Sequence, residues 1–364
     1  MSALSFFPLL SLFAQFGRQP AAPLRLWLRS AGYKLLPPRA VVHQPEVRTR
    51  QDAVSASGIA GLHQRADVLV EKRPGPVPTI IVGGFVPDGI DAFYLLRGRL
   101  ATNGSIYYVN YPRRGFSMDL FQAQLEDLIE EIAVRRGRRP ALMAVSFGCA
   151  VALELLRRAS AAGRELPLAG LILISPVACS ADLLDPAEAK PSTLLGRVIK
   201  PYLGSTVRTD NAIVEKSRAV FLKMFEAGAQ NKEALRFLMT RGETRRLRDA
   251  VLGTINAIDG NGASERVRAL CDVPPLTAPQ VLFSGPALVL FAEKENAVLV
   301  ESSPTRREMT GRVTAWFPRG RCVTVTNHAD NPVQHASLIF HSQNFQPLFA
   351  AFYRSLRHLL HQAA

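Results

Sequence analysis

The sequence is poor in cysteine and in lysine, and it has no long apolar run. Its 364 residues include four cysteines and no CxxC pair, which argues against a disulfide framework or a zinc site and favours a reducing compartment. No apolar stretch approaches the roughly 20 residues that a membrane-spanning helix needs, so a polytopic membrane protein is excluded. No HExxH, GxxxxGK or GxGxxG motif is present, and the sequence therefore implies no metal or organic cofactor.

Positive charge exceeds negative charge, for a net charge of +14, and only eight of the 44 basic residues are lysine. An excess of this size occurs in proteins that bind nucleic acid or anionic membranes. Here the arginines are dispersed, with local runs only at 135–139 and 241–248, and few aromatic residues lie among them. This pattern indicates that the arginines lie on solvated helix faces, and it argues against a nucleic-acid partner. The alternative is that the positive charge attracts the protein to an anionic membrane surface.

The N-terminal 40 residues leave three hypotheses open. Residues 3–16 are strongly apolar, but Pro8 interrupts them and the basic residues follow instead of preceding them, unlike a secretory signal. Residues 24–36 alternate apolar and basic positions, as an interfacial helix does. The segment is therefore a peripheral membrane anchor, a helix packed on the domain, or a cleaved signal. We expect a cytoplasmic protein. Under the hypothesis of a peripheral anchor, it associates with the inner face of the membrane.

The rest of the chain has the pattern of an α/β protein. Near-continuous apolar runs, typical of strands buried on both faces, alternate with helical patterns. These runs cover residues 79–85, 105–112, 140–145, 168–176, 286–295 and 321–327. Two earlier stretches, 41–50 and 62–73, alternate in polarity and predict an antiparallel pair of strands. Together these patterns predict a mostly parallel sheet with helices on both faces.

A stretch of about a hundred residues interrupts this rhythm with helical patterns and no buried strand. We therefore expect four parts. They are an N-terminal segment (1–40), a first part of the core (41–180), a helical insertion (181–280) and a second part of the core (281–364).

The turn Ala144-Val145-Ser146-Phe147-Gly148 carries the strongest chemical signal. It stands between a buried strand and a helix, and small residues lie two positions to either side of Ser146. A sharp turn of this kind exposes the serine hydroxyl above the sheet and directs the helix N-terminus at it. Ser146 is therefore a candidate nucleophile. The alternative is a serine that only caps the helix.

With this turn in place, the chain from about residue 41 to 359 resembles the α/β-hydrolase family, with a helical cap inserted over the site. Gly83-Gly84-Phe85 lies some 60 residues before the turn, where the family carries H-G-F. Gly83 replaces the usual histidine, and Ala144 replaces the usual glycine. The resemblance implies an oxyanion hole made of the backbone amides of Phe85 and Phe147, which does not depend on the missing histidine.

The resemblance also points to the acid. In the family it follows the strand after the cap, in a pattern like G-E-K-D, and the sequence here reads A-E-K-E. This aligns Glu295 with the acid, and glutamate can orient an imidazole as aspartate does. Glu293 and Asp182 remain alternatives, as does the possibility that these are ordinary loop charges.

Three histidines follow the last predicted strand and are candidates for the base. His335 lies 12 residues before a final helix expected from Pro347. Its context P-V-Q-H-A-S-L resembles a histidine motif of bacterial hydrolases of this fold. His328 and His341 remain alternatives.

These residues predict a serine hydrolase that cleaves carboxylic esters through an acyl-enzyme on Ser146. Apolar faces in the insertion suggest a small-molecule ester with a lipid-like acyl chain, although such faces also serve packing. They comprise Phe221, Leu222, Met224, Phe225, Leu235, Phe237, Leu238 and Met239. The alternatives are an acyltransferase or thioesterase on the same fold, or a catalytically inactive membrane-associated member.

Overall fold

A computed structural model describes residues 39–58, 61, 64–203, 211–230, 235, 238–328 and 330–363, together with residues 26, 28 and 31. Its centre is a sheet with the strand order β1-β2-β4-β3-β5-β6-β7-β8. The strands are β1 (Val41–Val42), β2 (Asp67–Glu71), β3 (Thr79–Val82), β4 (Ile106–Asn110), β5 (Ala141–Val145), β6 (Gly170–Ile174), β7 (Pro286–Ala292) and β8 (Arg319–Val325). Neighbours from β4 to β8 pair in parallel, while β2 runs antiparallel to β1 and to β4. The predicted mostly parallel sheet is confirmed.

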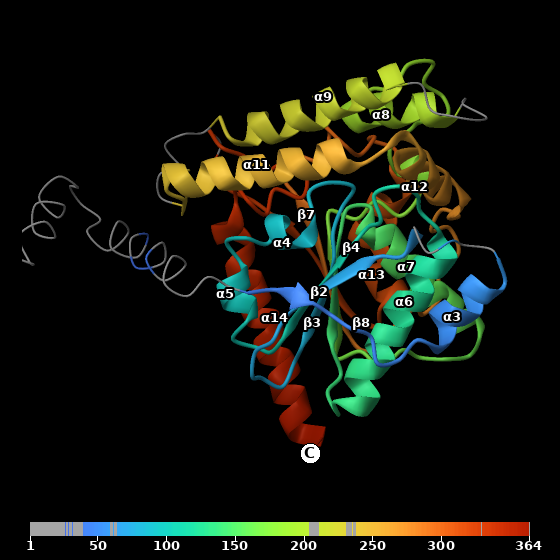
Figure 1. Cartoon of the computed structure of the whole chain (residues 1–364), viewed down its shortest axis with the longest axis vertical. Coiled ribbons are helices and arrows are strands. Elements are labelled where there is room, and N and C mark those ends of the chain that lie inside the picture. The colour runs from blue at the N-terminus through green and yellow to red at the C-terminus, as the bar shows by residue number, and fades with distance from the viewer. Residues whose placement is uncertain are drawn as a thin grey trace, which may run out of the picture.

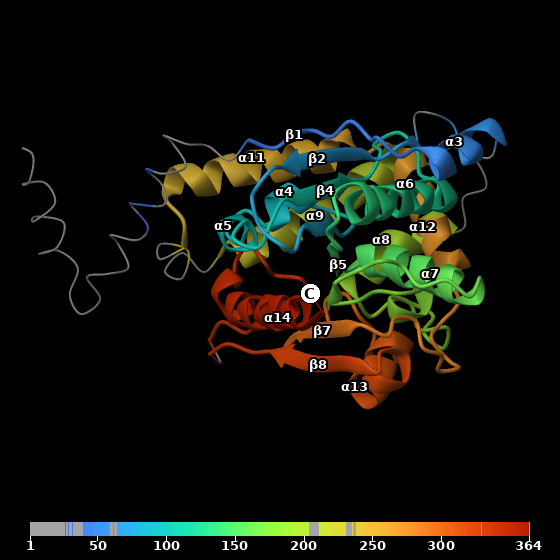
Figure 2. The same cartoon turned by 90° about the horizontal axis from the view of Figure 1, so that it is seen from below.

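Helices cover both faces of this sheet, because its inner strands are apolar on both sides. Ile80 and Val82 of β3 belong to the core beneath α6 (Met118–Glu130) and α7 (Gly148–Ala161), whereas Ile81 faces the opposite core. That second core lies beneath α4 (Gly89–Ala92), α5 (Arg97–Leu100) and α14 (Ser342–Ala363). Figure 2 shows α14 and α5 on one face and α6 and α7 on the other.

Between β6 and β7 the described residues form helices and no strand. These are a 3₁₀ turn (Ser180–Asp182), α8 (Leu194–Leu203), α9 (Asn211–Gly228), α11 (Arg241–Ala257) and α12 (Gly260–Asp272). Figure 1 shows α8, α9 and α11 lying across one end of the sheet. The insertion therefore covers the edge at which the parallel strands end, where α/β sheets place their ligands.

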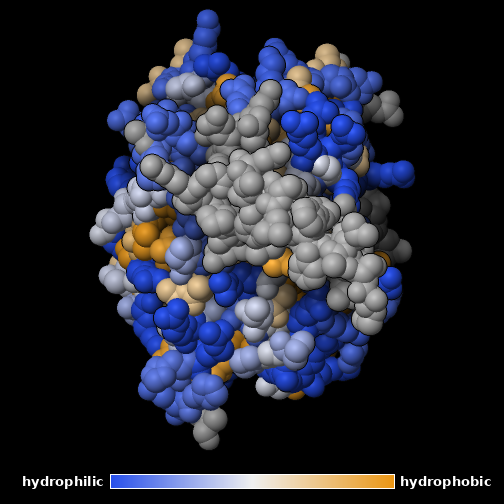
Figure 3. Space-filling view, turned by 90° about the vertical axis from the view of Figure 1, so that its left-hand side faces the viewer, coloured by the Kyte–Doolittle hydropathy of each residue, from blue (hydrophilic) through white to orange (hydrophobic). Residues whose placement is uncertain are grey.

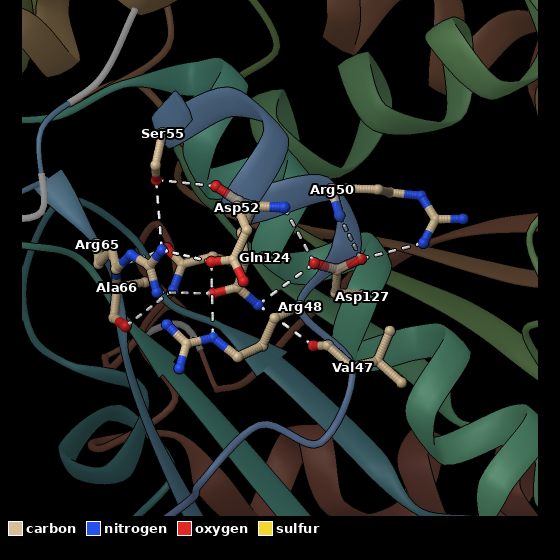
Figure 4. A network of polar contacts seen from close by, with 10 residues as sticks. Val47, Arg48, Arg50, Asp52, Ser55, Arg65, Ala66, Gln124 and Asp127 are labelled. Atoms are coloured by element: carbon tan, nitrogen blue, oxygen red, sulfur yellow. Dashed lines mark hydrogen bonds and ion pairs between the residues drawn. The ribbon is translucent and has the colours of Figure 1, made fainter. Parts of the chain in front are cut away.

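The first predicted strand is wrong beyond Val42, because a helix, α3 (Thr49–Ala56), begins within residues 41–50. Asp127 of α6 accepts hydrogen bonds from the backbone amides of Arg50 (3.2 Å) and Gln51 (3.1 Å) and from the Arg50 guanidinium (3.0 Å). Figure 4 shows this network. A buried carboxylate thus accepts hydrogen bonds from amides of the first turn of α3, which have no acceptor within the helix itself.

Two further helices differ from the sequence prediction. The final helix, α14, begins at Ser342 and contains Pro347, where the sequence suggested its start. Helix α13 (Pro304–Trp316) was not predicted, although Ser303 caps it and Pro304 occupies its first position. Both residues are ordinary start signals for a helix.

The hypotheses for residues 1–40 concern a segment that lies almost entirely outside the described residues. Among the described residues, no helix has both the length and the apolar character needed to cross a membrane. On the face shown in Figure 3, the residues drawn in colour are mostly hydrophilic, and the hydrophobic ones among them lie in separate groups. The membrane hypothesis stays a prediction.

Candidate active site

Ser146 sits in a strained turn between β5 and α7. Its φ is +50°, a left-handed value that a residue with a side chain rarely adopts. A Cβ on Gly148 would lie 2.5 Å from the carbonyl oxygen of Gly83 and 2.6 Å from that of Val82. Only glycine allows this approach of the helix to β3, which explains the small residue two positions after Ser146. The turn therefore holds the Ser146 side chain at the carboxyl end of β5.

His335 connects Ser146 to Glu295. Its Nε2 lies 2.9 Å from Ser146 Oγ, and its Nδ1 is hydrogen-bonded to Glu295 Oε2. Glu295 follows β7 and is only 1% exposed, and its Oε1 accepts a hydrogen bond from the amide of Ala292 at 2.6 Å. When Nδ1–H donates a hydrogen bond to the carboxylate, Nε2 carries no proton, and its lone pair faces the serine hydroxyl. The structure thus brings together the serine, histidine and glutamate that the sequence analysis favoured.

Electrostatics favour an ionised Glu295 at this position. Burial opposes its charged form, but the His335 charge, the hydrogen bond with His335, the Ala292 amide and the Ser175 hydroxyl together hold the pKa of Glu295 below its usual value. A carboxylate that stays charged next to an imidazole stabilises the imidazolium that forms when the imidazole takes a proton.

The two alternative acids lie in other environments. Oδ1 of Asp182 accepts hydrogen bonds from Ser303 Oγ (2.7 Å) and the Thr305 amide (3.0 Å), and its Oδ2 accepts one from the Ala178 amide (2.8 Å). Its carboxylate ties the start of α13 to the loop after β6. Glu293 accepts from the amide of Asn327 at 3.4 Å. Neither carboxylate forms a described contact with His335.

The other two histidines do not contact Ser146 in the described structure. His328 is exposed in the loop after β8. His341 is buried, with Nδ1 2.9 Å from Ser337 Oγ and Nε2 3.3 Å from the carbonyl oxygen of Asn331. Burial lowers the pKa of His341, which favours the neutral ring. Through its two hydrogen bonds, His341 joins Asn331 and Ser337, which lie on either side of His335 in the chain.

Backbone from the β3 loop passes directly beside Ser146. A Cβ on Gly84 would lie 3.4 Å from Ser146 Cβ, and the rings of Phe85 and Phe147 pack with their centroids 5.0 Å apart. This places the two amides suggested for an oxyanion hole, those of Phe85 and Phe147, on segments that flank the serine.

Two residues that the sequence analysis missed hold this loop. Tyr111 donates its hydroxyl proton to the carbonyl oxygen of Gly83 at 2.9 Å, and Arg266 of α12 donates to that of Phe85 at 3.3 Å. The carbonyls on both sides of Gly84 are therefore fixed, and with them the orientation of the Phe85 amide between them.

A cavity of about 430 Å³ opens at Ser146 and His335, beneath the insertion. Its walls are mainly apolar. They include Phe221, Met224 and Phe225 of α9, Val251 and Ile255 of α11, and Ile339 and Phe340 of the loop before α14. Thus three of the residues suggested for an acyl pocket line it.

The other suggested pocket residues have different positions. Leu235, Leu238 and Met239 do not line the cavity but pack with α11 in a hydrophobic cluster that also contains the cavity residues Val251 and Ile255. Leu222 is partly buried and does not line the cavity, and Phe237 lies outside the described residues. Among the described residues, no group of three or more His, Cys, Asp or Glu side chains is arranged to hold a metal ion.

Comparison with known proteins agrees with this architecture. The model of the alpha/beta hydrolase family matches residues 80–343, which span the sheet from β3, the insertion and all three candidate site residues. The chain therefore belongs to the alpha/beta hydrolase family. No curated protein matches it.

Solved structures with the same fold include esterases. An esterase from Thermogutta terrifontis has a TM-score of 0.52 at 15% identity, covering 80% of this chain and 94% of its own. An esterase from Exiguobacterium antarcticum has a TM-score of 0.53 at 13% identity, covering 79% and 96%. MenH from S. aureus has a TM-score of 0.52 at 13% identity, covering 80% and 98%. At these identities the likeness concerns the fold alone.

Proposed function

We propose that this protein is a serine ester hydrolase with Ser146 as nucleophile, His335 as base and Glu295 as acid. The observation that carries the proposal is the position of His335, with Nε2 2.9 Å from Ser146 Oγ and Nδ1 hydrogen-bonded to the buried Glu295. A hydroxyl, an imidazole and a carboxylate in this order form an activated nucleophile, and the arrangement recurs on unrelated folds.

The chemistry follows from the geometry. His335 Nε2 accepts the Ser146 proton while Oγ attacks the ester carbonyl, and Glu295 stabilises the resulting imidazolium. The carbonyl oxygen becomes an oxyanion, which accepts hydrogen bonds from the Phe85 and Phe147 amides. Donors of this kind are worth about 10²- to 10³-fold each in rate. His335 then donates its proton to the departing alcohol, and water, activated by the same imidazole, hydrolyses the acyl-enzyme.

The cavity supports a medium- to long-chain acyl group as the preferred substrate. Aromatic and aliphatic side chains of α9 and α11 line it next to Ser146, and each CH₂ group that leaves water contributes about 0.8 kcal/mol, or about fourfold in kcat/KM when the contact persists in the transition state. Esterases occur among the structures of similar fold, which is compatible with an ester as the substrate.

A series of p-nitrophenyl esters from acetate to palmitate tests the proposal. We expect kcat/KM to rise with chain length beyond butyrate and then to level off once the cavity is filled. Activity confined to acetate would exclude the acyl pocket, whereas absence of any activity that depends on Ser146 would exclude the hydrolase. Repeating the assay with a competing alcohol separates hydrolysis from acyl transfer, since only a transferase forms the new ester as its main product.

A further inference from the structure

Ser175 has a left-handed backbone conformation and has no role in the proposed mechanism. Among the non-glycine residues that the structure describes, Ser146, Ser175 and Ala336 have positive φ values of 50°, 45° and 50°. Strained residues of this kind persist where the surroundings enforce them, often at functional sites. Ser146 is the candidate nucleophile and Ala336 follows the candidate base, which leaves Ser175 to be explained.

The backbone of Ser175 is fixed between the strands that carry the nucleophile and the acid. Ser175 follows β6, and its amide donates to the carbonyl oxygen of Leu290 in β7 at 2.7 Å. The preceding residue, Ile174, accepts a hydrogen bond from the Ser146 amide at 2.9 Å. Ser175 is completely buried, so its side chain lies inside the junction of β5, β6 and β7.

The Ser175 hydroxyl has two partners there. Its oxygen accepts a hydrogen bond from the amide of Ala336 at 3.0 Å, directly after His335 in the chain. Because that bond uses only a lone pair, the hydroxyl proton stays available for donation. The Ser175 hydroxyl also interacts with the Glu295 carboxylate and is among the groups that hold the pKa of Glu295 below its usual value. One hydroxyl therefore interacts with the acid and is hydrogen-bonded to the loop that carries the base.

We propose that Ser175 is a positioning residue that sets the acid and the base of the site against each other. The proposal rests on the proposed function. Its hydroxyl holds the backbone directly after His335 through the Ala336 amide and interacts with the Glu295 carboxylate, so that His335 meets both Glu295 and Ser146. Glycine would adopt the same φ without strain, so the serine at this position is explained by its hydroxyl and not by its backbone.

Two variants separate the effect of the Ser175 hydroxyl from the effect of its strained backbone. Ser175→Ala removes the hydroxyl and keeps the strain, whereas Ser175→Gly removes both. We expect both variants to lower kcat by about 10- to 100-fold, in the range found for residues that orient catalytic groups, with little change in KM. We also expect Ser175→Gly to unfold at a higher temperature than Ser175→Ala. A role in folding alone would instead make the loss of kcat follow the loss of stability.

Ser303→Ala is the matched control. Ser303 is also a buried serine, 1% exposed, whose hydroxyl bonds a buried carboxylate, that of Asp182, at 2.7 Å. Its loss should lower the melting temperature and leave kcat unchanged. Full kcat in Ser175→Gly, or an equal loss of kcat in Ser303→Ala, would overturn the inference.

Ser146→Ala in the same assay keeps the two proposals apart. If the wild type shows no activity that depends on Ser146, the proposed function fails. If that activity is present and the Ser175 variants retain it in full, only the role of Ser175 fails. Because Ser175→Gly relieves strain, it supplies a folded variant even if Ser175→Ala does not fold.

Discussion

The guanidinium of Arg266 lies over the ring of Tyr111, with its central carbon 4.9 Å from the ring centroid. Arg266 is completely buried, and none of the described carboxylates forms an ion pair with it. Its nitrogens donate to the carbonyl oxygens of Phe85 (3.3 Å) and Pro112 (2.7 Å). Burial lowers the pKa of Arg266 to about 10, so it remains charged at neutral pH. A buried cation thus links α12 of the insertion to the loop beside Ser146.

Replacing this cation should reduce activity more than stability. Arg266→Met leaves two carbonyls without donors, at about 1–3 kcal/mol each, but it also removes the desolvation cost of a buried charge. We expect these effects to offset one another to within about 2 kcal/mol, while kcat falls at least tenfold because the Phe85 amide loses its orientation.

Thermal unfolding and steady-state kinetics on the same preparations test this. Arg307→Met, at an exposed position of α13, should change neither quantity. Unchanged kcat in a folded Arg266→Met variant would show that the guanidinium does not orient the loop.

Glu295→Gln tests the acid. The amide has nearly the shape of the carboxylate but cannot stabilise the imidazolium and favours the wrong tautomer of His335. We expect kcat to fall by about 10³- to 10⁴-fold, with KM within a few-fold of the wild-type value. Glu293→Gln is the control, since its carboxylate accepts a hydrogen bond from the Asn327 amide and forms no described contact with His335. The assignment is wrong if the Glu293 variant loses the activity and the Glu295 variant keeps it.

The length of the acyl pocket should respond to Phe225. This side chain lines the cavity and packs against Phe340, with ring centroids 5.4 Å apart. Phe225→Ala enlarges the cavity, so the ester chain with the highest kcat/KM should become longer by two or more carbons, at about 0.8 kcal/mol per buried CH₂. Leu222→Ala removes a side chain of the same helix that does not line the cavity and should leave the chain-length profile unchanged. Identical profiles for both variants would place the acyl chain elsewhere.

Asp91 makes stability depend on pH. Burial, assisted by the nearby charge of Asp88, raises the pKa of Asp91 to about 6. The folded state therefore binds this proton more tightly than the unfolded state, and stability declines as the pH rises through 6. Asp91→Asn should be more stable than the wild type at pH 8, by up to about 3 kcal/mol, and equal to it at pH 4. Melting temperatures at the two pH values test this, and an equal difference at both would assign the effect to packing.

Much of the fold could be predicted from the sequence because the inner strands are buried on both faces and read as short apolar runs. The turn at Ser146 was visible for a similar reason, since it joins such a run to a helix between small residues. By contrast, α3 was misassigned because the carboxylate that caps it, Asp127, lies 77 residues from Arg50 in the sequence. A local polarity pattern contains no information about a partner so distant.

The supporting residues of the site were invisible for the same physical reason. Arg266 acts on Phe85 across 181 residues, and Ser175 on Ala336 across 161. Arg266 and Ser175 bond backbone atoms, which every residue carries, so the identity of the partner residue does not indicate the contact. In the segment L-I-S-P nothing local indicates the left-handed conformation of Ser175. Only its strained φ and complete burial in the folded chain identify it.

Covalent labelling with a fluorophosphonate probe tests the central claim most directly. The probe reacts only with an activated serine, and mass spectrometry of the intact protein and its peptides locates the adduct. We expect one adduct, on Ser146, which is absent from Ser146→Ala and forms at least about 10²-fold more slowly in a folded His335→Ala variant. A wild-type protein that remains unlabelled, or an adduct that persists in Ser146→Ala, would contradict that claim.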